Sequence, residues 1–254
     1  MNMSDRPPSV SFIVPALNEE GRICATVDTI LGAMNEVPDR PFEIVLVNDG
    51  STDKTAMLMD ELVLRRSEIR VVHNERNLGF GGAFQRGLAV AKNDYVMVVA
   101  GDNAASRESI VQTVRHLGEA DILIPRIANP EIRSRARRIG SRAYTLLLNF
   151  LFNLRVGYYN GMIPKRELLQ QLTLTTSSNA VHAEALVKLL KAGCTYKEVA
   201  IHHQPALDYR SAALKPRNLL KVFKAIIHLY REVHRPGAIP QLRRLETATT
   251  SEKP

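Results

Sequence analysis

Four short polar clusters in the first half of the chain carry residues that could bind a phosphate-containing ligand. Together they supply carboxylates, amides and closely spaced glycines, and they occupy residues 15–19, 48–53, 77–83 and 100–103. Carboxylates and amides can hold a base, a ribose or a cation, and glycines let backbone N–H groups approach a phosphate closely. We expect Asp49 to accept hydrogen bonds from a base or ribose, and Gly79, Gly81 and Gly82 to face a phosphate.

Each cluster follows an apolar run that could be a strand. Runs at 9–14, 43–47, 69–73, 95–99 and 122–124 alternate with helical patterns at 19–35, 53–66, 82–92 and 107–117. This alternation predicts an α/β fold in which helical crossovers join parallel strands. Because such sheets bind ligands beyond the carboxyl ends of their strands, the clusters are expected to converge on one cleft.

The second half of the chain has a different pattern. A basic run at 133–142 precedes an apolar stretch at 145–154, and a strand-like piece follows at 158–163. We then expect a helix at 180–192, a strand at 196–201 and a basic helix at 218–235. Residues 236–254 are rich in Thr, Pro and charge and are predicted to be a disordered tail.

Composition narrows the class of protein. The chain has 254 residues and a net charge of +8, which favours phosphates or anionic lipid as partners; nucleic acid is disfavoured because no recognition motif accompanies the charge. Cys24 and Cys194 do not make a disulfide framework. The N-terminus has no secretory signal, and the stretch 145–154 is about half the ~20 residues that a membrane span needs. We therefore expect a cytoplasmic protein with at most peripheral membrane contact.

The glycines exclude two common nucleotide-binding motifs. They follow the third strand rather than the first, and Phe84 occupies the last glycine position of a dinucleotide fingerprint. No Gly-Lys-Ser/Thr follows, so the segment is not a P-loop. A sugar nucleotidyltransferase would need a glycine-rich, Lys-containing loop after the first strand, where this chain has Pro15 to Glu19.

Three motifs resemble those that open glycosyltransferase family 2. They are Val14-Pro15-Ala16-x-Asn18-Glu19, Val47-Asn48-Asp49-Gly50-Ser51-x-Asp53 and Asn77-x-Gly79-x-Gly81-Gly82-Ala83, and the resemblance covers roughly residues 9–235. It implies a GT-A type α/β fold: a mostly parallel open sheet with helices on both faces, plus C-terminal acceptor-side helices. It also implies inverting transfer of a sugar from a nucleotide diphosphate sugar. The donor-binding residues that it implies are Pro15, Ala16, Leu17, Glu19, Asn48, Asp49, Gly79, Gly81, Gly82, Asp102 and Asn103.

Within that family, the second half looks most like the polyprenyl-phosphate sugar synthases. The matching pieces include Arg137-Arg138-x-x-Ser141-Arg142 ahead of an apolar helix and Glu198-Val199-Ala200-Ile201. This branch implies a polyprenyl phosphate acceptor and one domain over 1–235, with a nucleotide-sugar half at 9–125 and an acceptor half at 126–235. The implied acceptor or diphosphate ligands are Arg126, Arg137, Ser141, Arg210 and Lys215.

The acidic motif departs from the family pattern. Where the family has Asp-x-Asp, this chain has Ala100-Gly101-Asp102, and Ala104 occupies a position that often supplies an oxygen ligand. Asp102 is then the one carboxylate left to hold Mg²⁺ or Mn²⁺, helped by Asn103. The surplus of Arg and Lys could instead neutralise the leaving diphosphate.

The nature of the acceptor decides whether a base is needed. A lipid phosphate is already an anion near neutral pH, whereas a hydroxyl acceptor requires a nearby carboxylate. Glu184 matches the acidic position of the family on its helix and is the candidate base; a solvated helix charge is the alternative. With Asp102 it completes the predicted catalytic pair. A soluble hydroxyl acceptor and a non-catalytic nucleotide-sugar binder remain the alternative functions.

Overall fold

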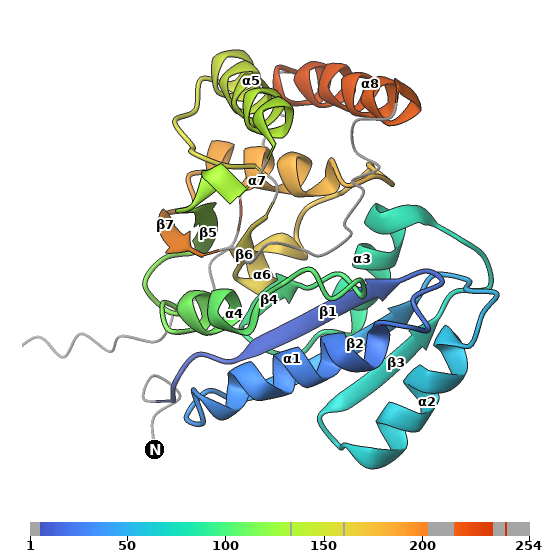
Figure 1. The fold of residues 1–254 in the computed structure, drawn as a ribbon. Helices are drawn as coiled ribbons and strands as arrows, with labels where there is room; N and C mark the ends of the chain where they lie inside the picture. The colour runs from blue at the N-terminus through green and yellow to red at the C-terminus, as the bar shows by residue number, and fades with distance from the viewer. Residues whose placement is uncertain (1–5, 133, 160, 203–215, 236–241, 243–254) are drawn as a thin grey trace, which may run out of the picture.

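The structure is a computed structural model that describes residues 6–132, 134–159, 161–202, 216–235 and 242 (Figure 1). Its strands are β1 (Val10–Ala16), β2 (Phe42–Asn48), β3 (Ile69–His73), β4 (Tyr95–Val98), β5 (Ile122–Ile127), β6 (Ile163–Pro164) and β7 (Tyr196–Ile201). Its α-helices are α1 (Ile23–Asn35), α2 (Thr55–Arg65), α3 (Gly79–Val90), α4 (Arg107–Val114), α5 (Arg135–Phe152), α6 (Arg166–Leu169), α7 (Val181–Lys191) and α8 (Pro216–Val233), and a 3-10 turn, η1 (Pro130–Ile132), precedes α5.

The first four strands form a parallel sheet in the order β3-β2-β1-β4, as the alternating pattern predicts. Successive side chains of a strand point to opposite faces, so Phe12 and Val14 enter one hydrophobic core and Ile13 enters the other. Helices α1, α2 and α4 pack against the first core, whereas α3, α7 and α8 pack against the second. The predicted open sheet with helices on both faces is confirmed.

A second, three-stranded sheet continues the first beyond β4. Its order is β6-β5-β7, with β5 parallel to β7 and antiparallel to β6. A single antiparallel bridge between Tyr95 and Lys165 joins the two sheets, and the Arg166 N–H donates to the Asp94 carbonyl (2.7 Å). Because β6 is antiparallel to both β4 and β5, β5 runs in the same direction as β1–β4. Of the described residues in the predicted strand-like piece at 158–163, Ile163 alone belongs to a strand.

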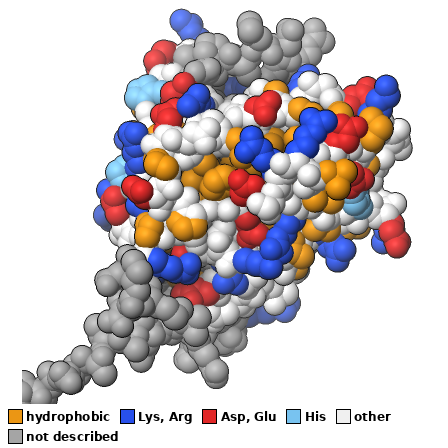
Figure 2. Space-filling view, turned by 90° about the horizontal axis from the view of Figure 1, so that it is seen from below, with side chains coloured by type: hydrophobic (Ala, Val, Ile, Leu, Met, Phe, Trp, Pro, Cys, Tyr) orange, Lys and Arg blue, Asp and Glu red, His pale blue; other side chains and the backbone are white. Residues whose placement is uncertain are grey.

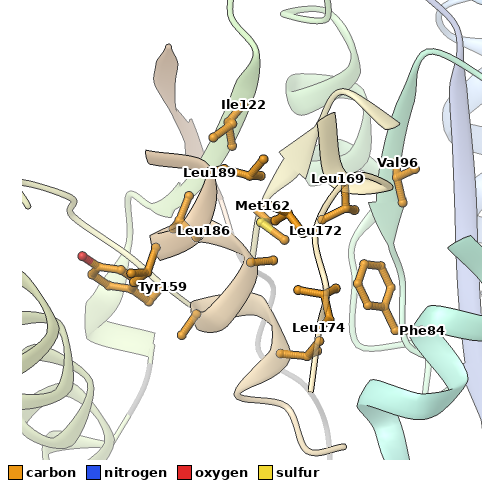
Figure 3. Packing of buried hydrophobic residues seen from close by; sticks show 14 of the residues in the cluster. Phe84, Val96, Ile122, Tyr159, Met162, Leu169, Leu172, Leu174, Leu186 and Leu189 are labelled. Carbon is orange, nitrogen blue, oxygen red and sulfur yellow. The ribbon is translucent and has the colours of Figure 1, made fainter. Parts of the chain in front are cut away.

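Buried side chains from both sheets share one of the two cores. Figure 3 shows Phe84 of α3 and Val96 of β4 on one side and Ile122 of β5 on the other, with Leu186 and Leu189 of α7 beside it. Each of these five side chains is at most 1 % exposed. The two predicted halves of the chain therefore bury one continuous apolar surface, which couples their folding.

The predicted basic run and apolar stretch turn out to be one helix, α5. It ends at Asn153, whose left-handed backbone (φ 48°) is a conformation that Asn tolerates at a helix C-terminus. In the described part of the chain, no helix is long and apolar enough to cross a membrane. Of the predicted tail, the structure describes Leu242, which is partly buried and packs against the core that includes α8; residues 236–241 and 243–254 lie outside the described residues.

Candidate active site

A crevice is expected where the strand order reverses, between β1 and β4. The chain places β2 and β3 on one side of β1 and β4 on the other, and parallel sheets bind ligands at the carboxyl edge of such a point. Here the Gly101 N–H donates to the Pro15 carbonyl (3.0 Å), and a Cβ at position 101 would lie 2.7 Å from the Cβ of Ala16. The glycine therefore lets the segment that carries Asp102 lie directly against the end of β1.

The loops after β1 and β2 are locked together by their polar residues. The Asn18 side chain accepts from the Thr52 N–H (2.9 Å), and the Asn18 N–H donates to Ser51 Oγ (3.0 Å). The Glu19 N–H donates to Thr55 Oγ1 (2.8 Å). Because residues 18–22 are used in this way, α1 begins at Ile23 rather than at the predicted residue 19. Leu17, at the tip of the loop, is 39 % exposed.

Asp49 and Asn48 bond to the protein itself. Asp49 is buried; its Oδ1 accepts from Asn74 Nδ2 and the Leu78 N–H (both 2.9 Å), and its Oδ2 accepts from the Gly79 N–H (3.0 Å). Asn48 Oδ1 accepts from the Ser51 N–H (2.9 Å). The Asp49 carboxylate therefore holds the start of α3, and its contact with a base or ribose stays a prediction.

The glycines after β3 let the start of α3 lie against a second backbone segment. The Gly81 N–H donates to the Ser177 carbonyl (2.9 Å), and a Cβ at Gly81 would lie 2.0 Å from the Thr176 carbonyl oxygen. Gly79 has φ +77°, and a Cβ there would lie 2.7 Å from the Ser177 carbonyl oxygen. The N–H groups of Gly79 and Gly81 are thus engaged by protein acceptors. The glycines admit a second backbone segment, and a Cβ at Gly82 would meet Leu78. Their contact with a phosphate stays a prediction.

Asp102 is partly buried and lies in the segment that follows β4. Its Oδ1 accepts from the Ala104 N–H (3.1 Å), while Asn103 has φ 54° and its Oδ1 accepts from Thr29 Oγ1 (3.0 Å). Burial raises the pKa of Glu19 above its ordinary value; the Arg22 guanidinium opposes this shift and the Asp102 charge adds to it. Glu19 and Asp102 are therefore close enough to interact electrostatically.

The side chains at the cleft suit a metal ion that takes most of its ligands from the substrate and from water. Among the described residues, no group of three or more His, Cys, Asp or Glu side chains could hold a metal ion. Mg²⁺ binds through one or two carboxylates together with substrate phosphates and water. Asp102 fits that mode, whereas Asn103 already uses its oxygen on Thr29.

Glu184 does not have the surroundings of a catalytic base. Its side chain is buried and forms a 2.8 Å ion pair with Lys188, and its oxygens accept from the Thr175 and Thr176 N–H groups (both 2.9 Å). Burial raises its pKa, but the hydrogen bonds from Lys188, Thr176 and Thr175 outweigh that effect, so the pKa lies below its ordinary value. Such a carboxylate is a poor proton acceptor. Because Glu184 is 2% exposed, it is not a solvated helix charge, whereas its role as a catalytic base stays a prediction.

A basic pocket lies at the carboxyl end of β5. Its volume is about 200 Å³, and its lining residues are Arg126, Ile127, Pro130, Arg138, Ser141, Arg142, Gly157 and Tyr158. Because β5 runs in the same direction as β1–β4, this pocket opens at the same edge of the molecule as the Asp102 cleft. Three guanidinium groups and a hydroxyl suit a phosphate, since Arg can bind its oxygens through paired hydrogen bonds.

Two of the residues predicted to bind the acceptor substrate line the pocket, together with two arginines that were not among the predicted ligands. Arg126 and Ser141 line it, but the lining from α5 is Arg138 and Arg142 rather than Arg137. Helix geometry explains this, since residues three and four apart share a face of α5. The sequence contains this signal, because Arg138, Ser141 and Arg142 have that spacing. Arg210 and Lys215, the other predicted ligands, lie outside the described residues.

The partly exposed carboxylate of Glu198 orients the mouth of this pocket. Glu198 Oε1 accepts from the Gly157 N–H (2.6 Å), and its Oε2 lies 3.4 Å from Arg126 Nε. A Cβ at Gly157 would lie 2.9 Å from both carboxylate oxygens. Glu198, on β7, therefore positions both Arg126 and the turn after α5.

Comparison with curated proteins finds relatives that act on lipid phosphates. A dolichyl-phosphate beta-glucosyltransferase from Trichomonas vaginalis is 27% identical over 144 residues, covering 53% of this chain and 43% of that protein. A dodecaprenyl-phosphate galacturonate synthase from Rhizobium johnstonii is 33% identical over 118 residues, covering 45% of this chain and 35% of that protein. The chain spans less than half the length of these relatives.

Solved structures share the fold. Glucosyl-3-phosphoglycerate synthase from Mycobacterium tuberculosis, in complex with UDP, superimposes with a TM-score of 0.67 at 20% identity, covering 88% of this chain and 80% of that one. The same enzyme was also crystallised with Mg²⁺ and UDP (TM-score 0.65, 18% identity, covering 88% and 80%). The predicted GT-A type fold is thereby confirmed. The sequence pattern of glycosyl transferase family 2 matches residues 11–188, and the chain belongs to that family.

Proposed function

We propose that this chain transfers a sugar from a nucleoside diphosphate sugar to a polyprenyl phosphate at a membrane surface. The observation that carries the proposal is the pocket of three arginines and a serine hydroxyl, which opens at the same sheet edge as the donor cleft. The relatives named for dolichyl-phosphate and dodecaprenyl-phosphate products support the same acceptor class. A lipid acceptor would place the protein at a membrane as a peripheral component.

The donor occupies the crevice between β1 and β4 in this proposal. Pro15, Ala16 and Leu17 border the nucleotide, and Asp102 would hold Mg²⁺ or Mn²⁺. Such an ion would supply positive charge that stabilises the leaving diphosphate. Arginines of the neighbouring pocket lie on the acceptor side of the same edge.

The reaction then needs no general base. An oxygen of the acceptor phosphate attacks the anomeric carbon with its own electron pair, and the bond from that carbon to the diphosphate oxygen breaks. The nucleoside diphosphate leaves with the bonding electrons, and the configuration at the carbon inverts. Because the nucleophile is already an anion, the burial and ion pairing of Glu184 are no obstacle.

The test compares transfer with hydrolysis of the donor by water. Arg138→Ala should lower transfer to polyprenyl phosphate by about ten- to a hundredfold, which corresponds to about 1–3 kcal/mol, and leave donor hydrolysis nearly unchanged. Asp102→Ala should abolish both reactions. Arg65→Ala on α2 is the matched control, because its side chain is 70% exposed and pairs with Glu61 on the same helix.

A hydroxyl acceptor predicts the reverse pattern. Glu184→Gln would then abolish transfer, and Arg138→Ala would have a mild effect. Transfer to a soluble sugar, with none to polyprenyl phosphate, would reject the proposed acceptor. Release of UDP or GDP from a panel of donor sugars, with and without Mn²⁺, measures all of these rates in one assay.

A further inference from the structure

The positive charge of the chain is concentrated on two neighbouring helices. Helices α5 and α8 together contain eight basic residues and one acidic residue, so they supply a net +7 of the +8 carried by the whole chain. They lie side by side at the top of Figure 1, away from the β1–β4 sheet, and Phe152 of α5 contacts the ring of Tyr230 on α8. The acidic residue, Glu232, pairs with the buried Lys188 (2.7 Å).

Helix α5 carries a second apolar stripe that faces away from the core. At about 100° per residue, its exposed apolar positions fall within an arc of about 100°, opposite the buried Leu148 and Phe152. Phe150 is 84% exposed and Leu146 is 68% exposed. The stripe consists of Ile139, Ala143, Leu146, Leu147 and Phe150.

Helix α8 repeats the arrangement. Phe223, Ile227 and Tyr230 are exposed at a spacing of four and three residues, while Ile226, Leu229 and Val233 are buried. Lys224 and Arg231 are exposed beside the outward stripe. We call the exposed apolar and basic residues of these two helices the α5–α8 surface.

We propose that the α5–α8 surface docks on an anionic lipid bilayer, with its apolar stripes among the acyl chains and its basic residues at the headgroups. Amphipathic helices with basic residues beside their apolar face bind such bilayers in two ways: they bury apolar side chains among the acyl chains, and their charges are attracted to the anionic headgroups. The proposal rests on the proposed function, because it places the pocket formed by Arg138, Ser141 and Arg142 at the membrane surface, where the headgroup of a lipid phosphate lies.

Charge favours a bilayer over a second copy of the chain. A symmetric dimer through this surface would bring together the exposed basic residues of two copies, Arg135 and Arg142 of α5 and Lys224 and Arg231 of α8, and like charges repel. The opposite face of the molecule differs: Figure 2 shows basic, acidic and apolar side chains interspersed there. An anionic bilayer complements one face of the molecule and not the other.

Vesicle binding tests the surface without any acceptor present. The full chain is sedimented with vesicles of phosphatidylcholine alone, or of phosphatidylcholine mixed with phosphatidylglycerol, both lacking polyprenyl phosphate. We expect binding to the anionic vesicles that weakens as salt is raised. Leu146→Glu/Phe150→Glu should weaken it about tenfold or more, and Leu64→Glu should not, although Leu64 on α2 is also exposed (87%).

Each other outcome has a definite meaning. No binding by the parent, or equal binding by the double variant, overturns the docking surface. A parent dimer in light scattering that the double variant abolishes would assign the surface to a second copy. Transfer by the parent to a short, water-soluble prenyl phosphate tests the proposed function separately: its failure beside intact vesicle binding would reject the acceptor and leave the surface standing.

Discussion

His182 shows at the residue scale how burial changes what a side chain can do. Its ring lies 5.4 Å from that of Phe80 and 5.8 Å from that of Phe84, measured between centroids. Its Nδ1 is buried with no hydrogen-bond partner in the described part of the chain. Burial lowers its pKa to about 4, because a charged imidazole would lose its hydration. These surroundings favour a structural role for His182.

This shift predicts a loss of stability in mild acid. Between pH 6.5 and about 4 the unfolded chain binds a proton at His182 that the folded chain does not, so the free energy of unfolding falls as the pH falls through that window. The slope from this residue is at most about 1.4 kcal/mol per pH unit. Urea unfolding of His182→Leu should show a flatter pH dependence than the parent, whereas exposed His228→Leu should match the parent. Equal slopes for all three would contradict this account.

At the scale of the element, the start of α3 depends on contacts from two distant segments. Asp49 accepts from the Leu78 and Gly79 N–H groups, and Ser177 accepts from the Gly81 N–H. The glycines are required because backbone atoms of residues 176 and 177 lie where a Cβ would be. Asp49 of the donor half and Ser177 of the acceptor half therefore both contact the N-terminus of α3.

Gly81→Ala should destabilise the protein by about 1–3 kcal/mol, because the new methyl group would lie 2.0 Å from the Thr176 carbonyl oxygen and force the two segments apart. Gly140→Ala is the matched control, since a Cβ there meets nothing within 4 Å and Ala favours the helix by up to about 1 kcal/mol. Urea midpoints compare the two variants. A parent-like midpoint for Gly81→Ala would show that residues 176 and 177 do not pack there.

At the scale of the whole molecule, Lys188 joins three parts of the acceptor half. Its Nζ donates to the Thr173 carbonyl (2.7 Å) and pairs with Glu184 (2.8 Å) and with Glu232 of α8 (2.7 Å). Glu184 in turn holds residues 175 and 176, which adjoin the segment against Gly81. The position of α8 is thereby linked to the start of α3.

Lys188→Met should cost about 3–5 kcal/mol, because it leaves two carboxylates without their buried partner. Adding Glu184→Gln and Glu232→Gln should recover part of that loss, since the uncompensated charges are removed. Lys191→Met, on the same helix, serves as the control and should change the urea midpoint little. If the costs of the three substitutions simply add, the three side chains do not act as one network.

The strands of the donor half could be predicted from the sequence alone. The alternation of apolar runs and helical patterns predicted β1, β2 and β3 to within two residues at each end, because side-chain periodicity is a local property. The same pattern predicted that the polar clusters follow the strands and lie at one edge of the sheet. The family motifs, which are also local, pointed to the fold that the comparison with solved structures confirms.

Only the tertiary structure decided what several of these side chains do. Asp49 and Gly81 were predicted to contact ligand, yet each is engaged by protein groups from another part of the chain. Glu184 was predicted to take a proton, and it is ion-paired with Lys188 on its own helix. Arg138 replaced Arg137 in the pocket because the rotation of α5 against the core selects which arginines face β5. Hydrogen-bond partners and burial depend on segments far apart in sequence, and short-range spacing carries no information about them.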